Sequence, residues 1–192
     1  LVEIDTRSLK VTRQFAVSKP GHTSSTTKHT GGHGMEPPKP GDDSCSPTWA
    51  EPAVDGPSVY VACNNSSEIV EVNTRDWQVV RRIGARAGVY NLDVTRDGLR
   101  LVATNKRDQS VSIYDLKSGK ELARLPTKRK VLHGVVITPD DRYAFVSVEG
   151  IGSEPGTVEV IDLTALKTVA TVDVAPTAAG IDFYKTEPRK KP

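Results

Sequence analysis

Short runs of alternating apolar and polar residues fill most of the chain, and turn-forming residues separate them. One group reads VYVACN, then EIVEVNT, then VVRRI. Alternation with a period of two is typical of strands that bury one face of a sheet. No stretch shows the 3.6-residue period of an amphipathic helix. The pattern therefore predicts an all-β protein built from short antiparallel strands.

The pattern repeats along the chain. VDGPSVYVACNN, RDGLRLVATNK and PDDRYAFVSVEG align on three aspartates that are 42 and 43 residues apart, Asp55, Asp97 and Asp140. A second run aligns on Asn73, Asp115 and Asp162, with spacings of 42 and 47 because IGSEPGT lengthens one loop. Each unit reads as four short strands. Four-stranded units with such a period predict a β-propeller, in which each unit is one blade. A β-sandwich with accidental self-similarity is the alternative.

The repeat divides the chain into just under four blades. Full blades are expected at 47–83, 89–125 and 132–172. Three other parts belong to the predicted propeller at 1–184: a partial blade at 1–15, an insertion at 18–46 and a final first-type strand at 178–184. A polar tail follows at 185–192. We expect a C-terminal fragment of a larger, seven-bladed ring, with a closed four-bladed ring as the alternative.

These residues carry a family resemblance. VYVACN followed by EIVEVNT and VVRRI, and later YAFVSVEG, GTVEVIDL and TVATVDV, resemble the YVTN-type β-propeller repeat. The resemblance covers about 46–184 and also 1–15. It implies the fold but not one function, because similar propellers occur in surface-layer and secreted binding proteins. Related propellers form the haem-binding part of dissimilatory nitrite reductase and the lactonase enzymes.

Composition narrows the choice of partners. The 192 residues carry a formal net charge of +2, with 36% hydrophobic and 5% aromatic residues, so a general polyanion-binding protein is disfavoured. Nucleic acid is not expected as a partner, because no aromatic platform is interleaved with the basic residues. The sequence contains no run of about 18 apolar residues, so it predicts no membrane-spanning helix. The chain begins at Leu1, which we interpret as truncation rather than leader removal alone.

One face of the predicted propeller carries the irregular loops. The connections from each fourth strand to the next first strand lie there, together with the loops between second and third strands. Basic residues gather in these loops: Arg86, Lys106, Arg107, Lys128, Arg129 and Lys130. We expect this basic rim, partly offset by Glu149 and Glu154, to attract an anionic small molecule or an acidic protein partner. An ordinary solvated rim is the alternative.

Equivalent positions near the start of the first strands line the expected channel mouth. Tyr90, Asn91 and His133 are the ligand-binding candidates there. A histidine at this position could hold haem or a metal, although a hydrogen-bonded structural role is the competing interpretation. No haem-attachment, nucleophile-elbow or zinc-protease motif occurs, so we predict no catalytic residues and no cofactor. Copper and haem remain as alternatives.

The insertion at 18–46 is poor in hydrophobic residues and is predicted to be flexible. It holds three histidines and the single methionine: His22, His29, His33 and Met35. Imidazole and thioether groups together suit copper, and imidazole alone suits zinc or nickel. The spacing matches no named metal motif, so a solvated loop or a lid over the channel are the other interpretations.

Two cysteines are placed for a disulfide. Cys45 immediately precedes a first strand, and Cys63 ends the antiparallel second strand of the same blade. A bridge across this separation of 18 residues would contribute about 3 kcal/mol in the chain-entropy model. It would also favour a periplasmic or extracellular location. The alternative is a buried Cys63 beside an exposed Cys45 thiol.

Three functional classes follow from these features. The leading hypothesis is a non-enzymatic, secreted or periplasmic propeller that binds a ligand or a partner through its loop-bearing face. The second is an enzyme or redox-accessory propeller of the nitrite-reductase kind, in which His133 or the insertion histidines hold a cofactor. The third is a structural module of the cell surface.

Overall fold

The computed structural model describes residues 1–20 and 44–185. In these residues every strand pairing is antiparallel and no helix is present. The first four-stranded sheet comprises β3 (Pro47–Pro52), β4 (Ser58–Cys63), β5 (Glu68–Asn73) and β6 (Gln78–Gly84). The second comprises β7 (Val89–Val94), β8 (Arg100–Asn105), β9 (Ser110–Asp115) and β10 (Lys120–Pro126). The third comprises β11 (Val131–Ile137), β12 (Tyr143–Glu149), β13 (Gly156–Asp162) and β14 (Lys167–Val174).

Each sheet is a simple meander whose strands are paired in chain order. Aspartates at the ends of the third strands form the tight turns that lead into the fourth strands. The Asp115 carboxylate accepts a hydrogen bond from the Ser118 amide at 2.7 Å, and the Asp162 carboxylate accepts one from the Ala165 amide at 2.8 Å. Such local bonds satisfy the backbone where the ladder stops.

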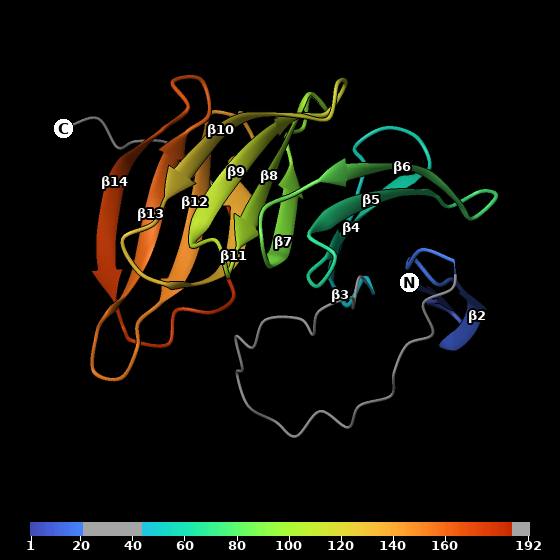
Figure 1. The fold of residues 1–192 in the computed structure, drawn as a ribbon, viewed down its shortest axis with the longest axis horizontal. Helices are drawn as coiled ribbons and strands as arrows, with labels where there is room; N and C mark the ends of the chain where they lie inside the picture. The colour runs from blue at the N-terminus through green and yellow to red at the C-terminus, as the bar shows by residue number, and fades with distance from the viewer. Residues whose placement is uncertain (21–43, 186–192) are drawn as a thin grey trace.

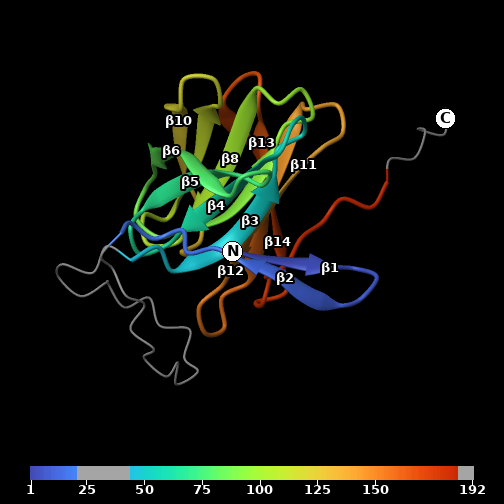
Figure 2. The same ribbon diagram turned by 90° about the vertical axis from the view of Figure 1, so that its right-hand side faces the viewer.

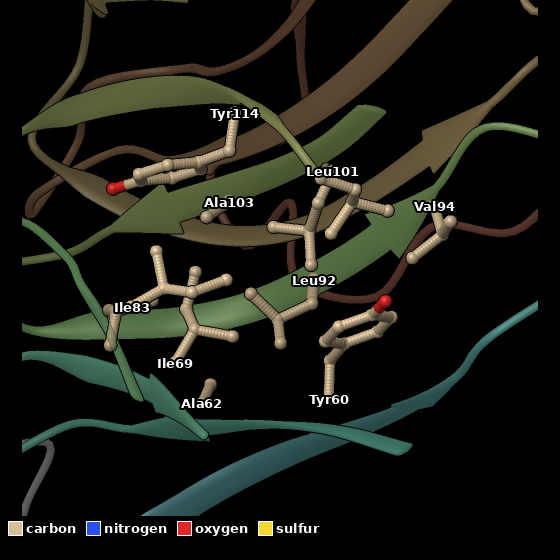
Figure 3. Packing of buried hydrophobic residues seen from close by; sticks show 11 residues of the cluster. Tyr60, Ala62, Ile69, Ile83, Leu92, Val94, Leu101, Ala103 and Tyr114 are labelled. Atoms are coloured by element: carbon tan, nitrogen blue, oxygen red, sulfur yellow. The ribbon is translucent and has the colours of Figure 1, made fainter. Parts of the chain in front are cut away.

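The core lies between the sheets. Tyr60, Ala62 and Ile69 of the first sheet pack against Leu92 and Tyr114 of the second (Figure 3). The opposite face of the second sheet packs on the third through a separate cluster that contains Val102, Val111, Ile113, Leu132 and Ile161. The middle sheet is therefore buried on both faces, and the three sheets follow one another in chain order (Figure 1).

The first strands form the inner side of this arrangement. β3 lies beside β7, and β7 lies beside β11. Each of the three carries a bulge where its register to the second strand shifts. Four-stranded meanders stacked face to face, with their first strands innermost, make an incomplete β-propeller. The predicted fold class is confirmed, and each sheet is called a blade below.

Aspartates also join the second and third blades. The Asp93 carboxylate accepts a hydrogen bond from the Ile137 amide at 2.6 Å. The Asp141 carboxylate accepts bonds from the amides of Arg96 and Asp97, at 2.7 and 2.9 Å. Asp141 stands where the other two blades have glycine, and it adopts a φ of 57°. Its two bonds to the neighbouring turn account for a carboxylate in this strained position.

The parts outside the three blades lie at opposite ends of the stack. β1 (Val2–Asp5) and β2 (Lys10–Gln14) form a hairpin at the end away from β14 (Figures 1 and 2). Leu1, Phe15 and Val17 from this region cover the outer face of the first blade. A strand was expected at 178–184, but in the described residues this segment runs beside β11 without ladder pairing.

The described residues contain no long apolar helix of the kind that crosses a membrane.

Candidate functional site

Four side chains meet where the second and third blades open toward the loop-bearing face. Tyr90 comes from β7, Lys106 directly follows β8, His133 comes from β11 and Glu149 ends β12. We call these four residues the mouth cluster. Tyr90 and His133 lie near the starts of first strands, and Lys106 and Glu149 lie at the ends of second strands. These positions are neighbours, because the end of a second strand pairs with the start of the first strand in an antiparallel meander.

Lys106 is held between two rings. Its ammonium nitrogen lies 3.7 Å from the centroid of the Tyr90 ring and 3.4 Å from His133 Nδ1. The two rings meet edge to face, with centroids 5.7 Å apart. On the other side of the imidazole, His133 Nε2 lies 2.7 Å from a carboxylate oxygen of Glu149. The cluster is thus a continuous chain of polar and cation–π contacts.

The contacts fit one hydrogen-bond pattern of the neutral imidazole. A lysine ammonium can only donate, so His133 Nδ1 accepts the bond from Lys106. In the neutral imidazole, Nε2 then carries the proton and donates it to Glu149. Burial lowers the pKa of Lys106, and the nearby Glu149 charge partly opposes that shift. The side chains of His133 and Glu149 are 15% and 24% exposed, so both remain partly in contact with solvent.

Backbone contacts fix the two rings in place. The Thr48 hydroxyl donates to the carbonyl of Tyr90 at 2.7 Å, and the Thr104 hydroxyl donates to the carbonyl of His133 at 3.0 Å. Thr48 belongs to the first blade and bonds to the second, and Thr104 belongs to the second blade and bonds to the third. The rings are therefore positioned by the blade interfaces rather than by loops alone, which suits a preorganised site.

The loop between β8 and β9, which contains Lys106, packs closely against the connection between β6 and β7. A side chain at Gly88, where φ is +72°, would place its Cβ 2.7 Å from the backbone nitrogen of Arg107. The Arg107 guanidinium in turn donates to the carbonyl of Asn64 at 2.7 Å. Glycine is needed for both the conformation and the close approach. Arg107 therefore serves as a tie between two loops.

The other basic residues do not converge on the mouth. Arg86 forms an ion pair with Glu121, which raises the pKa of Arg86 and lowers that of Glu121. Lys128 and Arg129 lie 3.0 and 4.0 Å from the Asp173 carboxylate. Lys130 is exposed beside them. The expected rim is thus dispersed: Arg86, Lys128 and Arg129 lie against carboxylates, and of the rim residues only Lys106 contacts the other mouth residues.

Asn91 has a structural position. It is buried, and its side-chain oxygen accepts a hydrogen bond from the Val135 amide at 3.3 Å, across the interface between β7 and β11. The structure therefore brings Tyr90, His133 and Lys106 together and places Asn91 behind them. Glu149 was expected only to offset the rim charge. Its position at the end of a second strand, beside the start of the first strand, is the signal that could have placed it against His133.

The Cys45–Cys63 disulfide is confirmed, with Cα atoms 4.3 Å apart. Both cysteines are fully buried. Ser18 accepts a hydrogen bond from the Cys45 amide at 3.1 Å, so the bridge holds the chain on both sides of the insertion.

The proposed metal ligands of the insertion, His22, His29, His33 and Met35, lie outside the described residues. Within 1–20 and 44–185, no group of three or more His, Cys, Asp or Glu side chains is arranged to hold a metal ion. A metal at His133 would have to displace Lys106 or Glu149, since each contacts one ring nitrogen.

Solved structures support the fold. Hydrazine synthase from Kuenenia stuttgartiensis is similar with a TM-score of 0.63 and 22% identity, over 71% of this chain and 37% of that one. The U3-55K protein and the WD40 repeats of RRP9 each give a TM-score of 0.58 and 15% identity, over 66% of this chain and 38% of theirs. WD40 repeats are propeller repeats. At such low identity the likeness shows the fold alone.

This chain thus spans under two fifths of the length of these structures. No protein-family model matches it, and no curated protein does either.

Proposed function

We propose that the chain is a non-enzymatic binding module, a secreted or periplasmic propeller of the YVTN type. Its mouth cluster binds an anionic small molecule or an acidic group of a protein partner. One observation carries the proposal: the Lys106 ammonium rests on the Tyr90 ring face and on His133, in a half-buried position. An anion that approaches this ammonium meets a cation whose geometry is already fixed.

The proposed role of His133 is to position Lys106. Glu149 accepts from Nε2, which leaves Nδ1 directed at the ammonium. The ring therefore orients the cation through Nδ1. The disulfide supports the proposed location, since disulfides persist in oxidising compartments.

The test uses inorganic phosphate and citrate as probes. Each is titrated into the full chain at constant ionic strength, and the imidazole resonances are followed by nuclear magnetic resonance. The His133 resonance is identified by its loss in a His133→Asn variant. We expect it to shift and saturate with at least one probe.

A matched pair of variants gives the site its control. Lys106→Met keeps an unbranched side chain of similar length but removes the ammonium that lies over the Tyr90 ring, and should reduce the affinity about tenfold or more. Lys128→Met removes a charge from the ion pair with Asp173 and should leave the affinity unchanged. If both variants lost affinity equally, the binding would reflect the overall positive charge and not this site. No saturable shift with either probe would overturn the proposed site.

A further inference from the structure

The mouth cluster carries one positive and one negative side chain on opposite sides of a single ring. The Lys106 ammonium lies 3.4 Å from His133 Nδ1, and a carboxylate oxygen of Glu149 lies 2.7 Å from His133 Nε2. Each charged group therefore contacts the imidazole, and the ring stands between them. We call Lys106 and Glu149 the split pair.

Other oppositely charged residues of the loop-bearing face are in direct contact. Lys128 lies 3.0 Å from the Asp173 carboxylate, and Arg124 lies 2.8 Å from that of Asp108. A charged ligand would have to compete with the partner in each of these ion pairs. The split pair differs, because a contact to one ring nitrogen does not use up an ammonium with three donors or a carboxylate with several acceptor sites.

The two charges of the split pair act on each other. Burial lowers the pKa of Lys106, and the Glu149 charge opposes this shift. While the imidazole is neutral, the charges of the split pair sum to zero. An anion that binds Lys106 therefore also meets the like charge of Glu149, which weakens the attraction. A ligand with a negative and a positive group meets an opposite charge at each end.

The separation of the two charges is fixed by the surrounding contacts. The Lys106 ammonium rests on the Tyr90 ring at 3.7 Å, and the Tyr90 and His133 rings meet edge to face. Threonine hydroxyls of the neighbouring blade hold the carbonyls of Tyr90 and His133. All four residues of the mouth cluster are partly exposed. The mouth cluster therefore presents solvent with two opposite charges at a set spacing, which favours a ligand of matching spacing.

We propose that the mouth cluster binds a small zwitterion, such as a free amino acid. The carboxylate of the ligand binds the Lys106 ammonium, and the ammonium group of the ligand binds the Glu149 carboxylate. The ligand thus bridges the split pair across the His133 ring. This inference rests on the proposed function, since it keeps Lys106 as the group that binds the anion and adds a second charged contact at Glu149.

Three pairs of probes test the inference: glycine with acetate, β-alanine with propionate, and 4-aminobutyrate with butyrate. The members of a pair have the same carbon chain and differ by an amino group, which is charged at neutral pH. Each probe is titrated into the full chain at constant ionic strength, and the His133 resonance is followed. In at least one pair we expect the amino acid to bind about tenfold more tightly than the carboxylate, because it gains a hydrogen bond between charged groups.

A matched pair of variants assigns this advantage to one carboxylate. Glu149→Gln keeps an oxygen that accepts from His133 Nε2 but removes the charge. The advantage of the amino acid should disappear in this variant, while the affinity for the simple carboxylate should not fall. Glu154→Gln removes an exposed charge from the loop that follows β12 and should keep the tenfold ratio. Circular dichroism checks that both variants are folded.

The outcomes separate this inference from the proposed function. Saturable binding with equal affinities within every pair would overturn the zwitterion and leave the anion site in place. An advantage that persists in Glu149→Gln would also overturn the inference, since the ammonium group of the ligand would then be bound elsewhere. If none of these probes, phosphate and citrate included, gave a saturable shift, the proposed function and this inference would both fail.

Discussion

Single hydroxyl groups join neighbouring blades at equivalent positions. The Thr104 hydroxyl accepts from the Asn91 amide at 3.1 Å and donates to the carbonyl of His133. The Ser147 hydroxyl accepts from the Gly134 amide at 3.0 Å and donates to the carbonyl of Ala179. In both cases the amide lies at the bulge, where the strand ladder leaves it without a partner. One side chain thus satisfies its own blade and ties it to the next.

Removing one such hydroxyl should be costly. Thr104→Val keeps the shape of a fully buried side chain but leaves the Asn91 amide unpaired. We expect the free energy of unfolding to fall by about 1–3 kcal/mol. Urea denaturation measures the change. Thr168→Val, at an exposed position of β14, is the control and should change stability by less than about 0.5 kcal/mol. Equal effects in the two variants would contradict the role assigned to the hydroxyl.

Glu51 should make stability depend on pH. Burial raises its pKa to about 7; the hydrogen bond from Trp49 opposes this shift, and the Asp93 charge adds to it. Between pH 4.5 and 7 the native state binds more protons than the unfolded state, so stability falls as pH rises through this window. Glu51→Gln stays neutral and should be more stable than wild type at pH 8, by about 1 kcal/mol after allowing for partial exposure.

Thermal unfolding at pH 5 and pH 8 tests this linkage. The difference in Tm between Glu51→Gln and wild type should be larger at pH 8 than at pH 5. Glu3→Gln, at an exposed strand position, provides the comparison and should show the same difference at both values. Parallel behaviour of wild type and Glu51→Gln would refute the assignment.

At the scale of elements, the β3–β4 hairpin depends on its disulfide. Cys63 pairs with Pro47 at the end of the ladder, and the bridge to Cys45 closes a separation of 18 residues. Replacing both cysteines with serine should lower the free energy of unfolding by about 2–4 kcal/mol. The comparison is wild type with and without a reductant: reduction should reproduce the loss in wild type and have no effect on the double variant. Insensitivity of wild type to reduction would count against a stabilising bridge.

The blades were predictable because their signals are local. The turn residues and the alternation repeat with the same spacing, so Asp115 and Asp162 mark strand ends in the sequence as they do in the structure. The strand expected at 178–184 depends instead on a partner strand that the local sequence does not specify. A strand requires a partner, and the segment at this position meets only the inner end of the third blade.

The site was predictable only in part, because charge partners come from other blades. Arg86 was assigned to the basic rim, yet Glu121 of the next blade neutralises it. The residues of the loop that contains Arg86 do not predict that contact. Lys106 was assigned to the same rim, and the structure turns it inward onto Tyr90 of its own blade and His133 of the next blade. The direction of a loop side chain is decided by the neighbouring blade, which spacing along the sequence does not specify.

At the scale of the whole molecule, equivalent side chains of successive blades make the same kind of contact to the blade that follows. Arg81 donates to the carbonyl of Leu116 at 2.6 Å, and Arg100 donates to the equivalent carbonyl, Leu163, in the following blade. Ser147 likewise bonds to the segment after the third blade. These contacts thus repeat from blade to blade, and after the third blade the position of the successor is taken by 179–185.

A glycine controls whether that last segment can dock. A Cβ at Gly134 would lie 2.8 Å from Ile181 Cγ2 and 3.2 Å from the Ile181 amide nitrogen, so Gly134→Ala should push the segment away. At Gly84 an added Cβ would meet no atom within 4 Å, which makes Gly84→Ala the matched control. We expect trypsin to cleave after Lys185 several-fold faster in Gly134→Ala than in wild type, with rates in Gly84→Ala unchanged. Mass spectrometry of the released peptide locates the cut. Equal cleavage in all three proteins would show that the segment is not held against β11.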